Sequence, residues 1–84
     1  MNITKVRLRR IDGDPYIRAI AMLELDGSLI INDILVIDTG SKLVVQLPQT
    51  AYAKRKGQQS VVPINSELRE NINRAVLDEY QSFC

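Results

Sequence analysis

The sequence contains no histidine and no tryptophan, and it has only one cysteine and four glycines. Without histidine the usual general base near neutral pH is missing, and no serine or cysteine can be activated by it. The four glycines are isolated along the chain, so they form no glycine-rich motif that could cradle a phosphate. These absences predict a protein that is not an enzyme and takes no small-molecule substrate.

The single cysteine, Cys84, is the last residue of the sequence. It can form neither an internal disulfide nor a metal site with a second sulfur, which fits a reducing compartment. An unpaired terminal thiol is also more often incidental than a redox sensor. No apolar run approaches the ~18 residues that a membrane span requires, and no basic and apolar leader is present. We expect a cytoplasmic protein without a membrane partner.

The acidic residues give little support for a metal site. Asp12 and Asp14 belong to the Asp-Gly-Asp-Pro cluster at residues 12–15, which suits a turn far better than a two-carboxylate site. Three further acids lie near predicted strand ends: Asp26, Asp33 and Asp38. We therefore expect no metal and no cofactor, and a nuclease, which needs clustered acids with a divalent metal, is disfavoured.

The chain of 84 residues is long enough for one domain, residues 1–84, with 45% apolar and 25% charged residues as in ordinary folded proteins. A chain this short buries only about 60–65% of its unfolded surface, so its margin of stability is thin unless a partner adds buried area. Oligomerisation is expected for this reason.

Alternation of apolar and polar residues predicts four strands, at residues 2–11, 16–25, 29–37 and 42–47. In the first strand Lys5, Arg7 and Arg9 share one face with Ile3, while Thr4 and its alternate neighbours point to the other. Asp26-Gly27 is a strong signal for a tight hairpin. Residues 61–62 could add a short fifth strand.

Residues 49–60 are polar and cationic, and they predict a loop with room for a turn of helix. An amphipathic helix is predicted over residues 66–83, with Asn65 or Ser66 as its N-cap. Its apolar positions recur at helical spacing: Leu68, Ile72, Ala75, Val76, Tyr80 and Phe83.

These elements predict an α+β fold, an antiparallel β-sheet of four to five strands joined as a meander of hairpins and followed by one C-terminal amphipathic α-helix. Residues 1–62 form the sheet with its basic loop, and residues 66–83 form the helix. The second and third strands are apolar on both faces, but one helix can cover only one face. A second copy of the chain is expected to cover the other, giving a homodimer.

The net charge of +1 conceals a sorting of charges along the chain. Residues 1–18 carry five basic and two acidic residues, residues 19–41 carry four acidic residues and no base, and residues 42–60 carry four basic residues and no acid. Such asymmetry indicates a basic surface region.

The most specific basic feature is the run Lys54, Arg55 and Lys56, which has no acid nearby in sequence and follows Tyr52, whose ring could stack on a base. A solvated charge run is an equally good interpretation of these three residues alone. The stripe of Lys5, Arg7 and Arg9 is a weaker candidate, because long basic side chains also protect edge strands from aggregation.

The order of several short segments resembles the stage V sporulation protein G (SpoVG) family, also called the septation regulators. The segments span nearly the whole chain: Val6-Arg7-Leu8-Arg9-Arg10, Arg18-Ala19-Ile20-Ala21, Asn32-Asp33-Ile34, Val36-Ile37-Asp38, Pro63-Ile64-Asn65-Ser66 and Ala75-Val76-Leu77-Asp78-Glu79-Tyr80. The resemblance implies a bacterial regulator connected with sporulation and cell division, which forms dimers, binds DNA and RNA and has an antiparallel sheet followed by a helix.

The resemblance also implies that the segment after the fourth-strand proline, here residues 49–56, sets sequence preference. This chain departs from the family pattern there, with Pro48-Gln49 in place of Pro-Ser and Val62 in place of the frequent His before Pro63. The candidate nucleic-acid-binding residues are Lys54, Arg55 and Lys56 for phosphates, and Tyr52 and Gln49 for bases.

An alternative function is that of a protein-interaction adaptor without a direct role for nucleic acid. An exposed helix face or an open strand edge would then bind the partner. The helix residues concerned are Glu67, Arg69, Glu70, Arg74 and Asp78.

Overall fold

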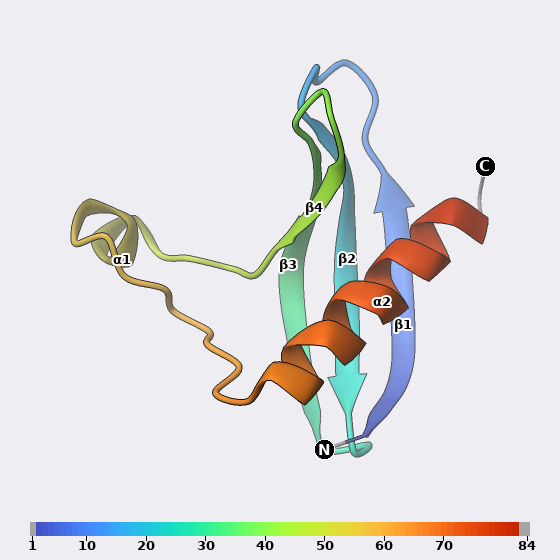
Figure 1. Cartoon of the computed structure of the whole chain (residues 1–84), viewed down its shortest axis with the longest axis vertical. Helices are drawn as coiled ribbons and strands as arrows, with labels where there is room; N and C mark the ends of the chain where they lie inside the picture. The colour runs from blue at the N-terminus through green and yellow to red at the C-terminus, as the bar shows by residue number, and fades with distance from the viewer. Residues whose placement is uncertain (1, 83–84) are drawn as a thin grey trace.

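The structure, a computed structural model, describes residues 2–82 and contains a four-stranded antiparallel sheet and two helices (Figure 1). The elements are β1 (Ile3–Arg10), β2 (Ile17–Leu25), β3 (Leu29–Asp38), β4 (Leu43–Gln46), α1 (Ala51–Arg55) and α2 (Ser66–Ser82). The strands lie in the order β1-β2-β3-β4, each paired with its neighbour in sequence. The predicted α+β meander followed by a C-terminal helix is confirmed.

The β2–β3 hairpin follows from its turn residues. Asp26 and Gly27 both have positive φ, 53° and 63°, as a type I′ turn requires, and the Ser28 amide donates to the Leu25 carbonyl at 2.9 Å. Glycine adopts this conformation without steric cost and aspartate tolerates it. The turn matches the right-handed twist of the strands, which the Asp-Gly pair predicts.

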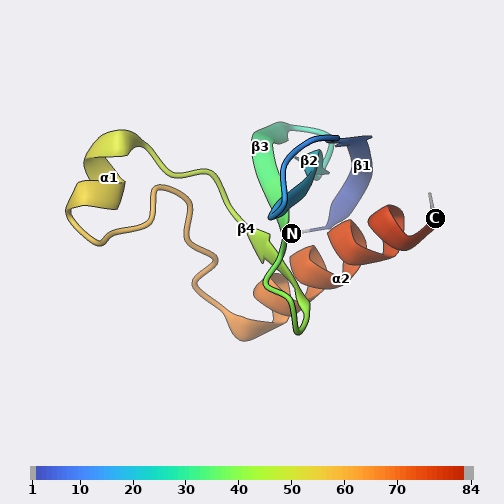
Figure 2. The same cartoon turned by 90° about the horizontal axis from the view of Figure 1, so that it is seen from above.

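Helix α2 covers one face of the sheet and packs against β1, β2 and β4 (Figures 1 and 2). Between helix and sheet lies one apolar core, in which Leu23, Ile34, Val36 and Val76 are fully buried. Full burial of such side chains stabilises the fold by about 1.5–3 kcal/mol each. The remaining buried members of the core are Ala19, Ala21, Leu25, Ile72 and Tyr80.

Tyr80 joins the end of α2 to the edge strand β1. Its ring is 8% exposed and the guanidinium of Arg10 lies 5.3 Å from its centroid. The predicted core position of Tyr80 is confirmed, whereas Phe83 and Cys84 lie outside the described residues.

The strand register is irregular at three places, and two of them bear on the predictions made from simple alternation. The β1–β2 register shifts between Ile3 and Lys5, so Ile3 packs against the core and not with Lys5 on the basic face, as simple alternation predicts. The β2–β3 register shifts again where Asp33 adopts φ 63°. Asp33 therefore lies at a bulge inside β3, and its predicted place near a strand end is wrong.

The described part of the chain has four strands, and the fifth strand expected at residues 61–62 is not formed. Val61 and Val62 belong instead to an irregular segment that leads to α2. Pro63, which follows them, is buried and has no amide hydrogen to donate to a ladder.

Helix α2 begins directly after Asn65, whose side-chain Oδ1 accepts from the Leu68 amide at 2.7 Å. Of the two N-cap candidates, the structure therefore selects Asn65. Neither α1 nor α2 is both long and apolar enough to cross a lipid bilayer.

Candidate nucleic-acid interface

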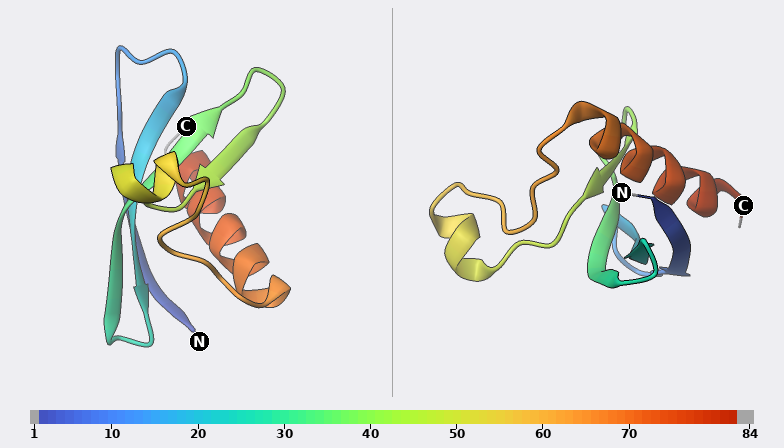
Figure 3. Two further views of the ribbon diagram at one scale, coloured as in Figure 1. Left: turned by 90° about the vertical axis from the view of Figure 1, so that its left-hand side faces the viewer. Right: turned by 90° about the horizontal axis from the view of Figure 1, so that it is seen from below.

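The segment between β4 and α2 projects sideways from the rest of the molecule (Figures 2 and 3). We call residues 48–63 the arm. It leaves the sheet at Pro48, carries α1 at its outer end and returns to the body at Pro63. Helix α2 contacts three strands, whereas α1 has no comparable contact with any described helix or strand.

The sequence of the arm defines the short helix α1. Thr50 is its N-cap and its Oγ1 accepts from the Ala53 amide at 3.0 Å. Ala53 is buried, and its carbonyl accepts from the Gln58 amide at 2.9 Å, so the return limb of the arm covers this side of the helix. Gly57, with φ 69°, ends the helical turn. The predicted loop with one helical turn is confirmed.

The three consecutive cations lie at the C-terminal end of α1. Lys54 and Arg55 are in its last turn and Lys56 is its C-cap, where positive charge interacts favourably with the helix dipole. Lys56 Nζ lies 5.8 Å from the centroid of the Tyr52 ring, and Tyr52 is 61% exposed. One face of α1 therefore presents an aromatic ring and a cation together.

None of these cations is neutralised by a residue that the structure describes. Lys54, Arg55 and Lys56 are exposed and form no ion pair with a residue in the described range 2–82. Three adjacent, unpaired cations raise the local positive potential, and an approaching anion displaces only water and counterions from them.

Two hydrogen bonds hold the limbs of the arm together next to α1, whose N-cap is Thr50. Gln49 Nε2 donates to the Gln58 carbonyl, and the Thr50 amide donates to Ser60 Oγ at 2.9 Å. Side chains, and not a strand ladder, connect the two limbs. We call this pair of contacts the clamp, which joins the two limbs of the arm to each other.

The stripe of Lys5, Arg7 and Arg9 lies on β1, exposed on the sheet face opposite α2. Its cross-strand partners on β2 are Glu24, Met22 and Ile20. Strand β1 is at one edge of the sheet, and the arm leaves from β4 at the other edge. Within one chain the structure therefore does not bring the stripe and the α1 cations together.

The sheet face opposite α2, which we call the open face, has an apolar centre. Its apolar side chains on β2 and β3 are half-buried by one another, and Ile30 is 51% exposed. Direct cross-strand pairs place the following residues on this face: Ile20, Met22, Ile30, Leu35, Ile37 and Val44.

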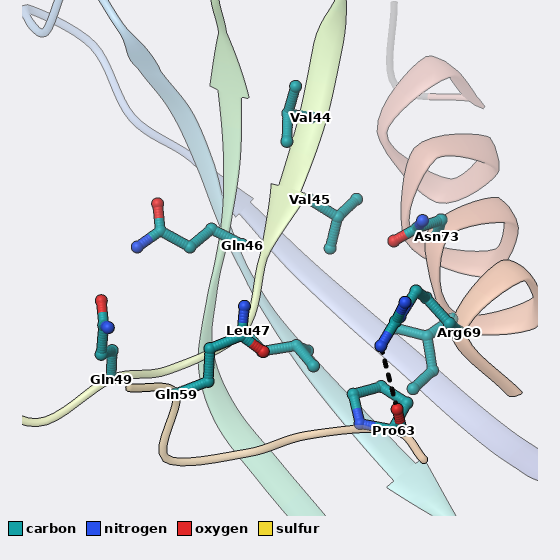
Figure 4. A pocket seen from close by; sticks show the side chains of 10 residues that line it. Val44, Val45, Gln46, Leu47, Gln49, Gln59, Pro63, Arg69 and Asn73 are labelled. Atoms are coloured by element: carbon teal, nitrogen blue, oxygen red, sulfur yellow. Dashed lines mark hydrogen bonds between the residues drawn. The ribbon is translucent and has the colours of Figure 1, made fainter. Parts of the chain in front are cut away.

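A groove of about 460 Å³ lies at the base of the arm, between the edge strand β4 and helix α2 (Figure 4). Val45 and Leu47 form one wall, Ile72 and Asn73 of α2 form the other, and Gln59 and Pro63 of the return limb close one end. Arg69 Nη2 donates to the Pro63 carbonyl at 3.1 Å, so its guanidinium is held at the groove.

Of the candidate base-contacting residues, Gln49 lines this groove and Tyr52 lies out on α1. Sequence reasoning missed Gln59 and Asn73, and it placed Arg69 only on a helix face for a protein partner. No periodicity or motif in the sequence indicates that these three side chains meet, because the arm that brings them together has no regular pattern.

Asp14 serves the local structure of the turn before β2. Asp14 Oδ1 accepts from the amides of Ile17 and Tyr16 at 2.9 and 2.8 Å, and these hydrogen bonds lower the pKa of its carboxyl group below 3.8. The turn role predicted for Asp14 is confirmed. No group of three or more His, Cys, Asp or Glu side chains placed to hold a metal ion occurs among residues 2–82.

Comparison with known proteins gives a consistent result. The model of the SpoVG family matches residues 1–82 of the chain. A protein of Bacillus subtilis named "Putative septation protein SpoVG" is 41% identical over 80 residues, which cover 95% of this chain and 82% of that protein. "Putative septation protein SpoVG 2" of Listeria monocytogenes is 40% identical, with 96% and 79% covered. The similarly named protein of Acetivibrio thermocellus is 33% identical, with 100% and 89% covered.

Proposed function

The chain belongs to the SpoVG family, and from this premise we propose that it is a dimeric regulator that binds DNA or RNA through the cations of α1. The relatives are named as septation proteins and not as enzymes. Regulation connected with septation or sporulation by a protein that binds nucleic acid, and not catalysis, is the function we infer.

The observation that supports this proposal most is the position of Lys54, Arg55 and Lys56. They lie at the C-terminal end of the short helix α1 in the projecting arm, exposed and without an acidic partner in the described residues. Neutralising phosphates with such cations releases counterions, which supplies most of the sequence-independent binding energy. Tyr52 adds an exposed ring on which a base could stack.

The open face supports the dimeric part of the proposal. Each 100 Å² of apolar surface removed from water contributes about 2.5 kcal/mol before entropy costs. Covering the apolar centre of this face with a second copy would therefore stabilise a small domain substantially. A dimer would also present two arms to one nucleic acid.

The test is to change Lys54, Arg55 and Lys56 together to alanine and to measure binding of duplex DNA between about 50 and 200 mM salt. Each phosphate that a cation neutralises contributes about 0.9 to the slope of log affinity against log salt. The change removes three cations from each arm, so the slope should flatten by about 5.4 if both arms of the dimer bind and by about 2.7 if one arm binds. Changing Lys5, Arg7 and Arg9 to alanine removes the same charge from β1 and is the matched control.

We expect the α1 variant to bind DNA weakly and with a flattened slope. The β1 variant should keep most of the affinity and most of the slope. If the β1 variant loses binding and the α1 variant keeps it, the interface lies on the stripe of Lys5, Arg7 and Arg9 instead. If the unchanged protein retards neither DNA nor RNA across this salt range and instead recovers a stable protein partner, the adaptor function replaces the proposal.

A further inference from the structure

The groove between β4 and α2 combines apolar walls with unused hydrogen-bonding groups. Its volume of about 460 Å³ falls in the range of 300–1,000 Å³ that small-molecule sites occupy. Val45 and Leu47, which are half-buried, supply apolar surface against which a flat ring can lie. This composition suits a flat, polar-edged ligand better than a purely aliphatic one.

Two amide side chains reach the groove from different elements. Gln59 comes from the return limb of the arm and Asn73 from α2, and neither side chain forms a hydrogen bond with a residue in the described range 2–82 (Figure 4). An amide carries a donor and an acceptor side by side, which is the pattern that base edges present. Both side chains are solvent-exposed, so they remain hydrated until a ligand replaces the water.

Arg69 is the third polar group, and its orientation is restrained. One Nη2–H donates to the Pro63 carbonyl at 3.1 Å, which holds the guanidinium plane where the arm rejoins the body. A guanidinium has five N–H donors and a flat face, so most of its binding capacity remains for a base or a phosphate.

From these contacts, and resting on the proposed function, we propose that the groove receives one unstacked base of a single-stranded nucleic acid whose phosphates contact α1. Gln49 of the clamp and Gln59 of the return limb both line the groove, so a strand bound along the arm would lie beside it. Bases in a duplex are stacked and paired and cannot enter such a groove. The preferred ligand is therefore single-stranded RNA or DNA and not a duplex.

The test compares three labelled probes of about 16 nucleotides: random-sequence single-stranded RNA, random-sequence single-stranded DNA and duplex DNA. The variant Asn73→Leu with Gln59→Leu replaces both amides with apolar side chains and so removes the hydrogen bonds that they would make to a base. We expect its affinity for the single strands to fall about ten- to a hundredfold, with duplex affinity and the salt slope unchanged.

Matched controls are Asn71→Leu with Gln58→Leu, which make the same changes at neighbouring positions outside the groove lining. A second variant, Asn73→Asp with Gln59→Glu, keeps the side chains polar and repels the strand, so it tests the groove even if the leucine variant folds poorly. Comparison of the two single-stranded probes shows whether the sugar 2′-hydroxyl takes part.

The proposal fails if the groove variants bind single strands as the unchanged protein does, or if the unchanged protein prefers the duplex. It also fails if the leucine variant alters only self-association, which would assign the groove to a second copy of the chain. These failures leave a salt-dependent interaction through α1 intact. Failure of the proposed function would appear differently, as the loss of salt-dependent binding to every probe.

Discussion

At the scale of single residues, short polar side chains determine where the backbone turns. Asp14, Thr50 and Asn65 each accept a hydrogen bond from an amide three residues further along the chain. Each satisfies a donor that the start of a strand or helix would otherwise leave unpaired. These three residues therefore help to determine where β2, α1 and α2 begin.

Asp14 makes one of these contacts dependent on pH. The amides of Ile17 and Tyr16 lower its pKa below 3.8, so the ionised carboxylate stabilises the folded state. This contribution is present in full well above pH 3.8 and is lost as the pH falls through the lowered value in the folded state. We expect Asp14→Ala to lower the melting temperature near neutral pH, and the gap to the unchanged protein to close in acid.

Thermal unfolding followed by circular dichroism over a series of pH values measures this gap. Asp12→Ala is the control, because Asp12 is exposed and its carboxylate accepts no hydrogen bond from residues 2–82. A gap for Asp14→Ala that stays constant into acid would contradict the assigned role of its charge.

At the scale of elements, the start of α2 depends on one cap. Asn65→Ala removes the acceptor of the Leu68 amide and should lower the free energy of unfolding by about 1 kcal/mol. Asn65→Asp keeps the acceptor and should cost much less. Urea denaturation measures both changes.

Ser66→Ala is the matched control for this cap, because Ser66 is the first residue of α2 and its side chain donates to or accepts from no residue in the described range. It should change the free energy of unfolding by less than about 0.5 kcal/mol. A larger loss for Ser66→Ala than for Asn65→Ala would reassign the N-cap.

Most of the elements could be predicted from local patterns. The alternation in β2 and the Asp-Gly turn identify the sheet, and the spacing of Ile72, Val76 and Tyr80 identifies α2. The bulges at Thr4 and Asp33 could not be predicted in this way, because each bulge depends on pairing with a neighbouring strand. One extra residue in a strand shifts every following side chain to the other face.

The candidate site was only partly predictable. The cations and Tyr52 are consecutive or nearly so, and their exposure follows from the polar loop around them. The groove brings together Gln59, Arg69 and Asn73 through an irregular arm whose path depends on the clamp and on the hydrogen bond from Arg69 to Pro63. Such side-chain contacts between distant segments have no periodic signature in a sequence.

At the scale of the whole molecule, the sheet separates the candidate binding surfaces. Helix α2 covers one face and the arm extends from the β4 edge (Figures 1 and 3). The open face is apolar at its centre, and the stripe of Lys5, Arg7 and Arg9 lies on β1 at the other edge of the sheet. One chain can therefore present only one set of α1 cations to a given stretch of nucleic acid. A second chain is needed to double the number of phosphates contacted, and linking two such sites raises the overall affinity by about 10²–10⁴-fold when both can engage.

This dependence on a second copy leads to a test of the open face. Leu35 lies near its centre, paired with Ile20 on one side and Gln46 on the other. Leu35→Glu places a charge where the two copies would meet, so sedimentation velocity should show twice the chain mass for the unchanged protein and the chain mass for the variant. Gln81→Glu adds the same charge on an exposed position of α2 and should leave the mass unchanged.

The same variant tests whether the two arms act together. If they do, a monomer engages only one set of α1 cations, and the slope of log affinity against log salt should fall to about half. Met22→Glu, on the neighbouring strand β2, repeats the test at a second position of the open face. A monomeric variant that keeps the full slope would show that a single arm makes all the phosphate contacts, and an unchanged mass for both variants would remove the open face as the dimer interface.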